Sequence, residues 1–301
     1  MRCRALLIIS VFTLTLIVQV KTTRGERTVT DQLGRRITLP DNPIRIISLA
    51  PSITEIIFAL NQGHRLKGVT LYSDFPPAAA RLPRIGSYVH LDLERIVALA
   101  PDLCIATKDG NPKAVVDRIA AFNIPVYAVD PRNTEAVIET ILEIGKLLNA
   151  FDQAKILSAD MRSRIDKVKA IAAKSAYRPR VFFQIGIAPI VSVGAQTFTH
   201  ELIELAGGKN LAKGDTAYPR YTQEQLVSLS PEVFIISSMA GKEAVDRARK
   251  EWETWTEVPA VRNKRLFFVD SDLFDRPTPR MVDALELLVR LIHPELFKEN
   301  P

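Results

Sequence analysis

The chain has 301 residues, of which 47% are hydrophobic and 25% charged, with two cysteines and a formal net charge of +6. This much apolar side chain excludes a disordered protein, the low cysteine content excludes a disulfide-stapled mini-protein, and 13 glycines exclude collagen. At roughly 150 residues per domain, the length predicts a globular protein of two domains.

The first 25 residues read as an export signal. Arg2 and Arg4 precede Ala5–Val20, which carries no charge. A helix of that length spans about 24 Å, less than the ~30 Å of a bilayer core, so we predict a secretory signal peptide over 1–25. An uncleaved N-terminal anchor is the alternative, because no A-x-A motif precedes Lys21. Much of the basic excess lies in this segment, so we expect no nucleic-acid partner.

The next segments predict a hairpin and then an α/β fold. Thr28–Leu39 alternates loosely around a turn with Gly34, which predicts a hairpin within 26–43. Beyond it, short apolar runs alternate with helix-length periodic segments, which is typical of parallel sheets covered by helices. These runs are Arg45–Leu49, Val126–Val129, Val181–Ile185, Val233–Ile236 and Leu266–Val269. Ser52 and Glu55 have the spacing of a capping box at the start of the first helix.

An internal repeat indicates two lobes. Leu93–Ala106 returns as Gln223–Ile236, each time as a short helix, a Pro-acid turn and a buried strand. A repeat this long excludes a solenoid and implies two similar units. A helix over Asp152–Lys174 would reach some 34 Å, enough to cross between them, although an ordinary surface helix has the same pattern.

We therefore predict an α/β protein with two doubly wound lobes, each with a central, mainly parallel sheet, joined by a long interdomain helix. The predicted segments after the hairpin are an N-terminal lobe over 44–150, an interlobe helix over 151–176 and a C-terminal lobe over 177–301.

Enzyme motifs are absent from the sequence. It has no G-x-G-x-x-G after a strand, no P-loop, no G-x-S-x-G and no H-E-x-x-H. His200 and Glu204 share a helix face, for which a solvated surface is favoured over a metal site. We predict no catalytic residue, no metal site and no cofactor. A secreted metal-dependent enzyme that uses His90 or His200 is the least favoured alternative.

Two kinds of loop suggest a ligand site. Tyr72 with Phe75, and Tyr218 in a second loop, offer rigid aromatic surface beside prolines, which suits a large, flat, partly apolar ligand. The loop Asp272–Arg276 follows a strand end, where parallel-sheet proteins bind ligands. Two interpretations of this loop stay open: ligand contact, or neutralisation of its acids by Arg276 in a solvated loop.

The repeat also places Glu94 and Glu224 at matching positions near the starts of two helices. The helix dipole explains each carboxylate separately. The pair would also suit a partner with two equivalent basic sites.

Taken together, these segments resemble a known family. The segments 72–77, 93–111, 180–186, 207–210 and 272–276 are similar to those of the cobalamin-binding periplasmic proteins of bacterial ABC importers. These belong to the helical-backbone class of substrate-binding proteins, which also serves iron siderophores and haem. The likeness covers about 45–291.

The resemblance implies a monomeric periplasmic receptor that holds cobalamin or a related corrinoid as its ligand in the interlobe cleft and delivers it to ABC permease subunits. Glu94 and Glu224 would dock to arginines of the permease. The ligand-binding residues that it implies are Tyr72, Tyr88, Thr107, Ile185, Tyr218, Asp272, Leu273, Phe274, Asp275 and Arg276.

The sequence departs from the family at several of these positions. The family has tryptophan where Tyr88, Thr107, Tyr218 and Leu273 stand, and phenylalanine where Ile185 stands. Less aromatic surface means weaker stacking, at ~0.5 to 1.5 kcal/mol for each aromatic contact. This predicts a lower affinity or a different corrinoid. The Thr28–Leu39 hairpin resembles that of siderophore-binding relatives, so a ferric-siderophore or haem receptor of the same fold remains the alternative.

Overall fold

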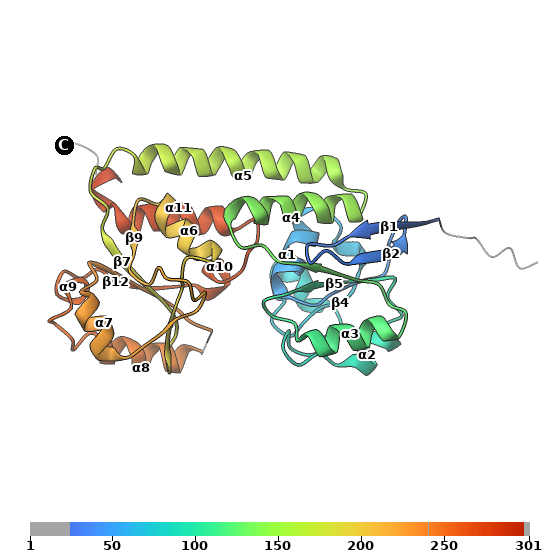
Figure 1. Cartoon of the computed structure of the whole chain (residues 1–301), viewed down its shortest axis with the longest axis horizontal. Coiled ribbons are helices and arrows are strands. Elements are labelled where there is room, and N and C mark those ends of the chain that lie inside the picture. The colour runs from blue at the N-terminus through green and yellow to red at the C-terminus, as the bar shows by residue number, and fades with distance from the viewer. Residues whose placement is uncertain (1–24, 240, 298–301) are drawn as a thin grey trace, which may run out of the picture.

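The computed structural model describes residues 25–239 and 241–297 as two α/β lobes beneath a long helix (Figure 1). The predicted fold class is therefore confirmed. Residues 1–24, which carry the predicted export signal, lie outside the described residues. Among the residues described, no helix has the length and apolar character needed to cross a membrane.

A two-stranded hairpin precedes the N-terminal lobe. Its antiparallel strands are β1 (Glu26–Thr30) and β2 (Arg36–Pro40), with Gly34 in the turn at φ +78°. Glycine suits this position because other residues rarely adopt a left-handed backbone. The Gln32 side chain ties the hairpin to the lobe, since its Oε1 accepts from the Asp130 amide at 2.7 Å.

The N-terminal lobe has a parallel four-stranded sheet in the order β4-β3-β5-β6. Its strands are β3 (Ile46–Ser48), β4 (Leu66–Gly68), β5 (Leu103–Thr107) and β6 (Val126–Val129). Its helices are α1 (Pro51–Ala59), α2 (Leu93–Ala98), α3 (Lys113–Ala121) and α4 (Thr134–Leu147), with 3-10 turns η1 (Gly63–Arg65) and η2 (Pro77–Arg81). The buried strands are apolar because helices cover both faces.

The C-terminal lobe has a mixed sheet in the order β10-β8-β7-β11-β12, with β9 paired to β7. Its strands are β7 (Arg180–Gly186), β8 (Ile190–Ser192), β9 (Lys209–Asn210), β10 (Arg220–Tyr221), β11 (Val233–Ser237) and β12 (Leu266–Val269). Its helices are α6 (Phe198–Leu205), α7 (Gln223–Leu229), α8 (Lys242–Trp252), α9 (Pro259–Arg262), α10 (Ser271–Phe274) and α11 (Met281–Ile292), with a 3-10 turn η3 (Pro294–Phe297). Each copy of the sequence repeat forms a helix followed by a strand: α2 and β5 in the N-terminal lobe, and α7 and β11 in the C-terminal lobe.

Helix α5 (Phe151–Ala172) runs along both lobes, packed on α4 of one and α11 of the other (Figure 1). One hydrophobic cluster continues through all three helices and includes Ile141, Ile165, Val168 and Leu285. The lobes therefore share buried apolar surface along their upper edge, which limits how freely they separate.

The predicted capping box at the start of α1 is wrong. The residue before the helix is Ala50, which makes no side-chain cap, and Pro51 opens the helix. Glu55 does not reach back to the helix start. Its carboxylate is buried and bonds to two arginines of the other lobe.

Close packing of α5 on α4 depends on Gly145, because a Cβ added there would lie 2.5 Å from the Ala154 Cβ. We predict that Gly145→Val lowers the free energy of unfolding by about 1–3 kcal/mol, since overpacking forces the two helices apart. Urea denaturation measures the change. Gly214→Ala is the control, because an added Cβ at Gly214 meets nothing within 4 Å. Equal midpoints for Gly145→Val and wild type would contradict this packing.

Candidate functional site

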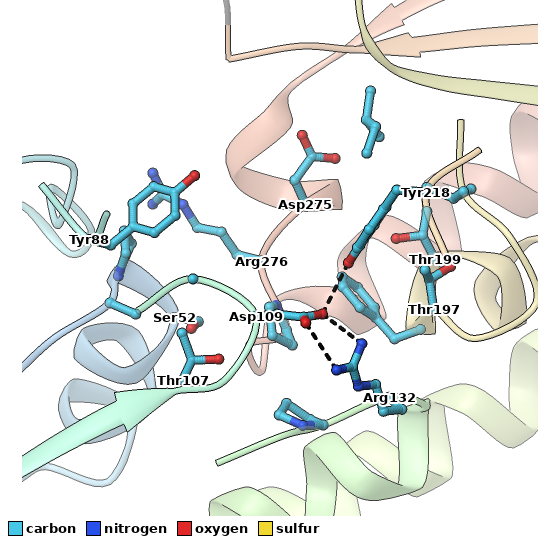
Figure 2. Close-up of a pocket in the computed structure, with 18 of the residues that line it drawn as sticks. Ser52, Tyr88, Thr107, Asp109, Arg132, Thr197, Thr199, Tyr218, Asp275 and Arg276 are labelled. Carbon is cyan, nitrogen blue, oxygen red and sulfur yellow. Dashed lines mark hydrogen bonds and ion pairs between the residues drawn. The ribbon is translucent and has the colours of Figure 1, made fainter. Parts of the chain in front are cut away.

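A cleft of about 320 Å³ lies between the lobes (Figure 2). Strand ends supply much of its lining: Thr107 ends β5, Asp130 follows β6, and Ile185 lies near the end of β7. This is the edge at which open α/β sheets bind ligands. The full lining is Ala50, Pro51, Ser52, Tyr72, Tyr88, Thr107, Asp109, Gly110, Asp130, Pro131, Arg132, Ile185, Val193, Gln196, Thr197, Phe198, Thr199, Tyr218, Met239, Asp275, Arg276 and Pro277.

Tyrosine side chains form exposed apolar surface in this lining. The exposed fraction is 57% for Tyr72 and 46% for Tyr218, and Tyr88 is partly exposed. Figure 2 shows Tyr88 and Tyr218 on opposite sides of the cleft. Aromatic rings lose little conformational entropy when they stack, so this arrangement suits a flat ligand held between the lobes.

A polar network crosses the cleft at Asp109. The Arg132 guanidinium donates to both Asp109 oxygens, at 2.8 and 2.9 Å, and its Nε lies 2.6 Å from Asp130. From the other lobe, Tyr218 Oη donates to Asp109 at 3.2 Å (Figure 2). Burial, together with the Asp109 carboxylate, raises the pKa of Tyr218 to about 12. Tyr218 is therefore a hydrogen-bond donor at neutral pH.

Arg276 lies at the floor of the cleft and is 8% exposed. Its guanidinium contacts three carboxylates: Asp272 at 2.5 Å, Glu55 at 3.0 Å and Asp74 at 3.3 Å. Of the two sequence interpretations, a solvated Arg276 is excluded by this burial. The neutralising role is correct for Asp272, whereas Asp275 makes no ion pair with Arg276 among the described contacts.

Asp275 is a second polar group of the floor. Its Oδ1 accepts a 2.9 Å hydrogen bond from the Ser237 hydroxyl. Burial raises the pKa of Asp275 to about 7, although the Ser237 bond acts in the opposite direction. A carboxyl group with this pKa is partly protonated near neutral pH, so it can donate as well as accept a hydrogen bond.

The structure brings most of the predicted ligand residues into one lining and leaves three outside it. Those in the lining are Tyr72, Tyr88, Thr107, Ile185, Tyr218, Asp275 and Arg276. Asp272 forms an ion pair with Arg276, Leu273 packs against the core, and Phe274 is fully buried with its ring 5.7 Å from that of Phe183. The short helix α10 explains this split, because successive helical side chains point about 100° apart.

Sequence reasoning missed the Asp109–Arg132 pair and the segment around Thr197 and Thr199. Asp130 carried a signal, since it directly follows a strand as Asp270 does. No local sequence signal pointed to Arg132, because its partner Asp109 lies 23 residues away in sequence.

Glu94 and Glu224 lie in the first turns of α2 and α7, and both side chains are exposed. The Glu224 carboxylate accepts hydrogen bonds from the Thr222 hydroxyl and from the backbone amide of Glu224 itself, and both lower the pKa of Glu224. Figure 1 shows α2 and α7 on the side of the molecule opposite to α5, one on each lobe. Two exposed acidic residues thus lie on helices at the same side of the molecule, one in each lobe.

The histidines singled out in the sequence are not gathered into a metal-binding group. His200 Nδ1 lies 3.0 Å from Asn210 Nδ2, and Glu204 pairs with Arg178. Among the described residues, no three His, Cys, Asp or Glu side chains are placed to hold a metal ion.

Comparison with known proteins agrees with this geometry. The family model described as "Periplasmic binding protein" matches residues 46–273. The chain belongs to the periplasmic binding protein family. The likeness to cobalamin-binding members, first seen in the sequence, is confirmed by the relatives and structures below.

Two curated relatives are vitamin B12-binding proteins. The protein of Photorhabdus laumondii is 31% identical over 252 residues, which cover 83% of this chain and 88% of that protein. The protein of Vibrio parahaemolyticus is 32% identical over 251 residues, which cover 83% of this chain and 90% of that protein. The homologues found are thus binding proteins.

Solved structures of similar fold include receptors for different ligands. The periplasmic vitamin B12 binding protein of Vibrio cholerae matches with a TM-score of 0.74 and 28% identity, over 86% of this chain and all of that chain. A periplasmic heme binding protein of Pseudomonas aeruginosa matches with a TM-score of 0.76 and 28% identity, over 84% of this chain and 93% of that chain. The fold is therefore shared by receptors for more than one macrocycle.

The raised pKa of Asp275 predicts a pH-dependent stability. The pKa of Asp275 is higher in the folded chain than its ordinary value of 3.8. The contribution of Asp275 to the free energy of unfolding is therefore fully present below pH 3.8 and is lost as the pH rises through about 7. At ~1.36 kcal/mol per pKa unit, the loss for wild type relative to Asp275→Asn is on the order of 4 kcal/mol. Urea denaturation at a series of pH values measures it. Parallel profiles for the two proteins would refute the assignment.

Proposed function

We propose that the protein is an extracytoplasmic receptor that captures cobalamin or a related corrinoid in the interlobe cleft and delivers it to an ABC importer. The protein acts as a periplasmic monomer, without catalysis or a resident cofactor. Its vitamin B12-binding relatives support the ligand class. The charge state of the cleft is the observation that carries the choice between ligands.

Both arginines of the described cleft lining already have carboxylate partners. Arg132 is held by Asp109 and Asp130, and Arg276 by three carboxylates that include Glu55. An anionic ligand group such as a haem propionate would have to displace one of these ion pairs. It would also approach Asp109, Asp130 and Asp275, which line the cleft. The lining therefore disfavours carboxylate-bearing ligands.

Peripheral carboxamides fit this lining better. An amide N–H can donate to Asp109 or Asp130, and an amide carbonyl can accept from Tyr218 or from the protonated form of Asp275. Corrinoids carry several carboxamides around a flat macrocycle, and exposed tyrosine faces are available for that macrocycle to stack on. This match of donors and acceptors supports a corrinoid over a haem.

A haem or ferric-siderophore receptor is the second candidate. It is favoured by the fold shared with a heme binding protein and by Tyr72, whose exposed phenol could approach iron. It would require the carboxylates of the lining to tolerate an anionic ligand.

Titration calorimetry of the purified protein distinguishes the candidates. We predict a heat of binding with cyanocobalamin and retention of the red ligand on desalting, with at least about tenfold weaker binding of haem and of a ferric siderophore. A factor of ten corresponds to ~1.4 kcal/mol. Tighter binding of haem or siderophore, with no heat from cyanocobalamin, would replace the first candidate with the second.

Delivery is tested separately from capture. We predict that the double variant Glu94→Ala and Glu224→Ala abolishes corrinoid uptake in cells, because two exposed anionic groups that contact the permease are lost together. Its affinity for cyanocobalamin should stay within about twofold of wild type, since neither residue lines the cleft. Asp117→Ala, an exposed acid on α3, is the matched control. A large loss of affinity in the double variant would contradict the docking role.

A further inference from the structure

Glu55 is a buried carboxylate of one lobe whose side-chain partners, among the described residues, are arginines of the other. It lies in α1 of the N-terminal lobe and is 4% exposed. Arg280 binds it through two nitrogens, Nε and Nη2, each at 2.8 Å, and Arg276 Nη1 donates at 3.0 Å. Three charge-assisted hydrogen bonds therefore join the lobes at one carboxylate.

Further contacts fix the two arginines against the N-terminal lobe. The Arg280 guanidinium lies 3.9 Å from the centre of the Phe75 ring, and Arg276 Nη2 donates to the Tyr72 carbonyl at 3.1 Å. Phe75 and Tyr72 belong to the same loop, which borders the cleft. The Glu55 carboxylate raises the pKa of Arg280, so this group stays charged.

Only one member of this group lines the cleft. Of the three ion-pair partners Glu55, Arg276 and Arg280, it is Arg276 that belongs to the cleft lining. A buried carboxylate without partners is strongly unfavourable, so Glu55 holds its arginines in place as firmly as they hold it. The side chain that faces the ligand space is thus oriented by a residue of the opposite lobe.

We propose that Glu55 is a positioning residue for ligand capture: with Arg280 it fixes Arg276 at the cleft floor and sets the spacing of the lobes at that edge. The affinity part of this inference rests on the proposed corrinoid function. The part about lobe spacing does not depend on any ligand.

A double-mutant cycle tests the affinity part with cyanocobalamin as the probe. Glu55→Gln and Arg276→Met should each weaken binding by about tenfold or more, and the double variant should bind no more weakly than Arg276→Met alone. Glu55→Gln acts through Arg276, so it has no effect once Arg276 is gone. Independent losses that add would overturn the positioning role, since a purely structural Glu55 would act in either background.

Two further variants keep this test interpretable. Glu143→Gln removes a half-buried carboxylate that bonds only within the N-terminal lobe and its hairpin, to Tyr127 and Gln32, and should bind like wild type. If Glu55→Gln does not fold, Arg280→Lys serves instead. Lysine keeps the charge but loses the two-pronged geometry, so the same non-additive loss is expected at smaller size.

Lobe spacing is measured without ligand, by electron spin resonance between labels at Lys113→Cys and Lys250→Cys. Both sites are exposed, one in each lobe, Cys104 is buried, and Cys3 is replaced by serine. The distance distribution should broaden in Glu55→Gln and Arg280→Lys and stay as in wild type in Glu143→Gln. An unchanged distribution in the first two variants would overturn the role of Glu55 in setting the lobe spacing. A wild-type protein that binds no corrinoid would refute the proposed function and leave this result standing.

Discussion

The arrangement of the cleft depends on one buried carboxylate. Glu55 stands between Arg276 and Arg280, and none of these charges is left unpaired in the protein interior. Removing a partner from such a group is far more costly than losing a surface ion pair, because the remaining charge stays desolvated. The contacts that join the two lobes include the apolar packing along α5 at one edge, the Tyr218–Asp109 hydrogen bond across the cleft, and this ionic contact at the floor of the cleft.

Between these contacts, the charged side chains of the cleft are largely paired with one another. Arg132 is neutralised before any ligand arrives by Asp109 and Asp130, and Arg276 by the carboxylates around it, whereas Asp275 lines the cleft with a hydrogen bond from Ser237. Such a cleft discriminates against anionic ligands, because an anionic group would have to break the existing ion pairs of Arg132 or Arg276 in order to bind. A neutral macrocycle with amide groups meets donors, acceptors and tyrosine faces without that cost.

Much of the fold could be predicted from the sequence, because its signals are local or repetitive. The strand-length apolar runs match β6 and β12 residue for residue, and the 93–106 repeat gives the same helix and strand in each lobe. The sequence is less informative about which residues form the cleft. The sequence spacing predicts a helix cap at Glu55, whereas its observed partners lie 221 and 225 residues away. Phe274 belongs to a loop with a ligand signal, yet the turn of α10 buries its side chain.

The most direct test of the whole account is a crystal structure of the protein with cyanocobalamin. The account predicts the corrin ring in the interlobe cleft, against Tyr72, Tyr88 and Tyr218, with Glu55 still bonded to Arg276 and Arg280. A ligand bound elsewhere, or lobes swung apart with the Glu55 contacts broken, would contradict it.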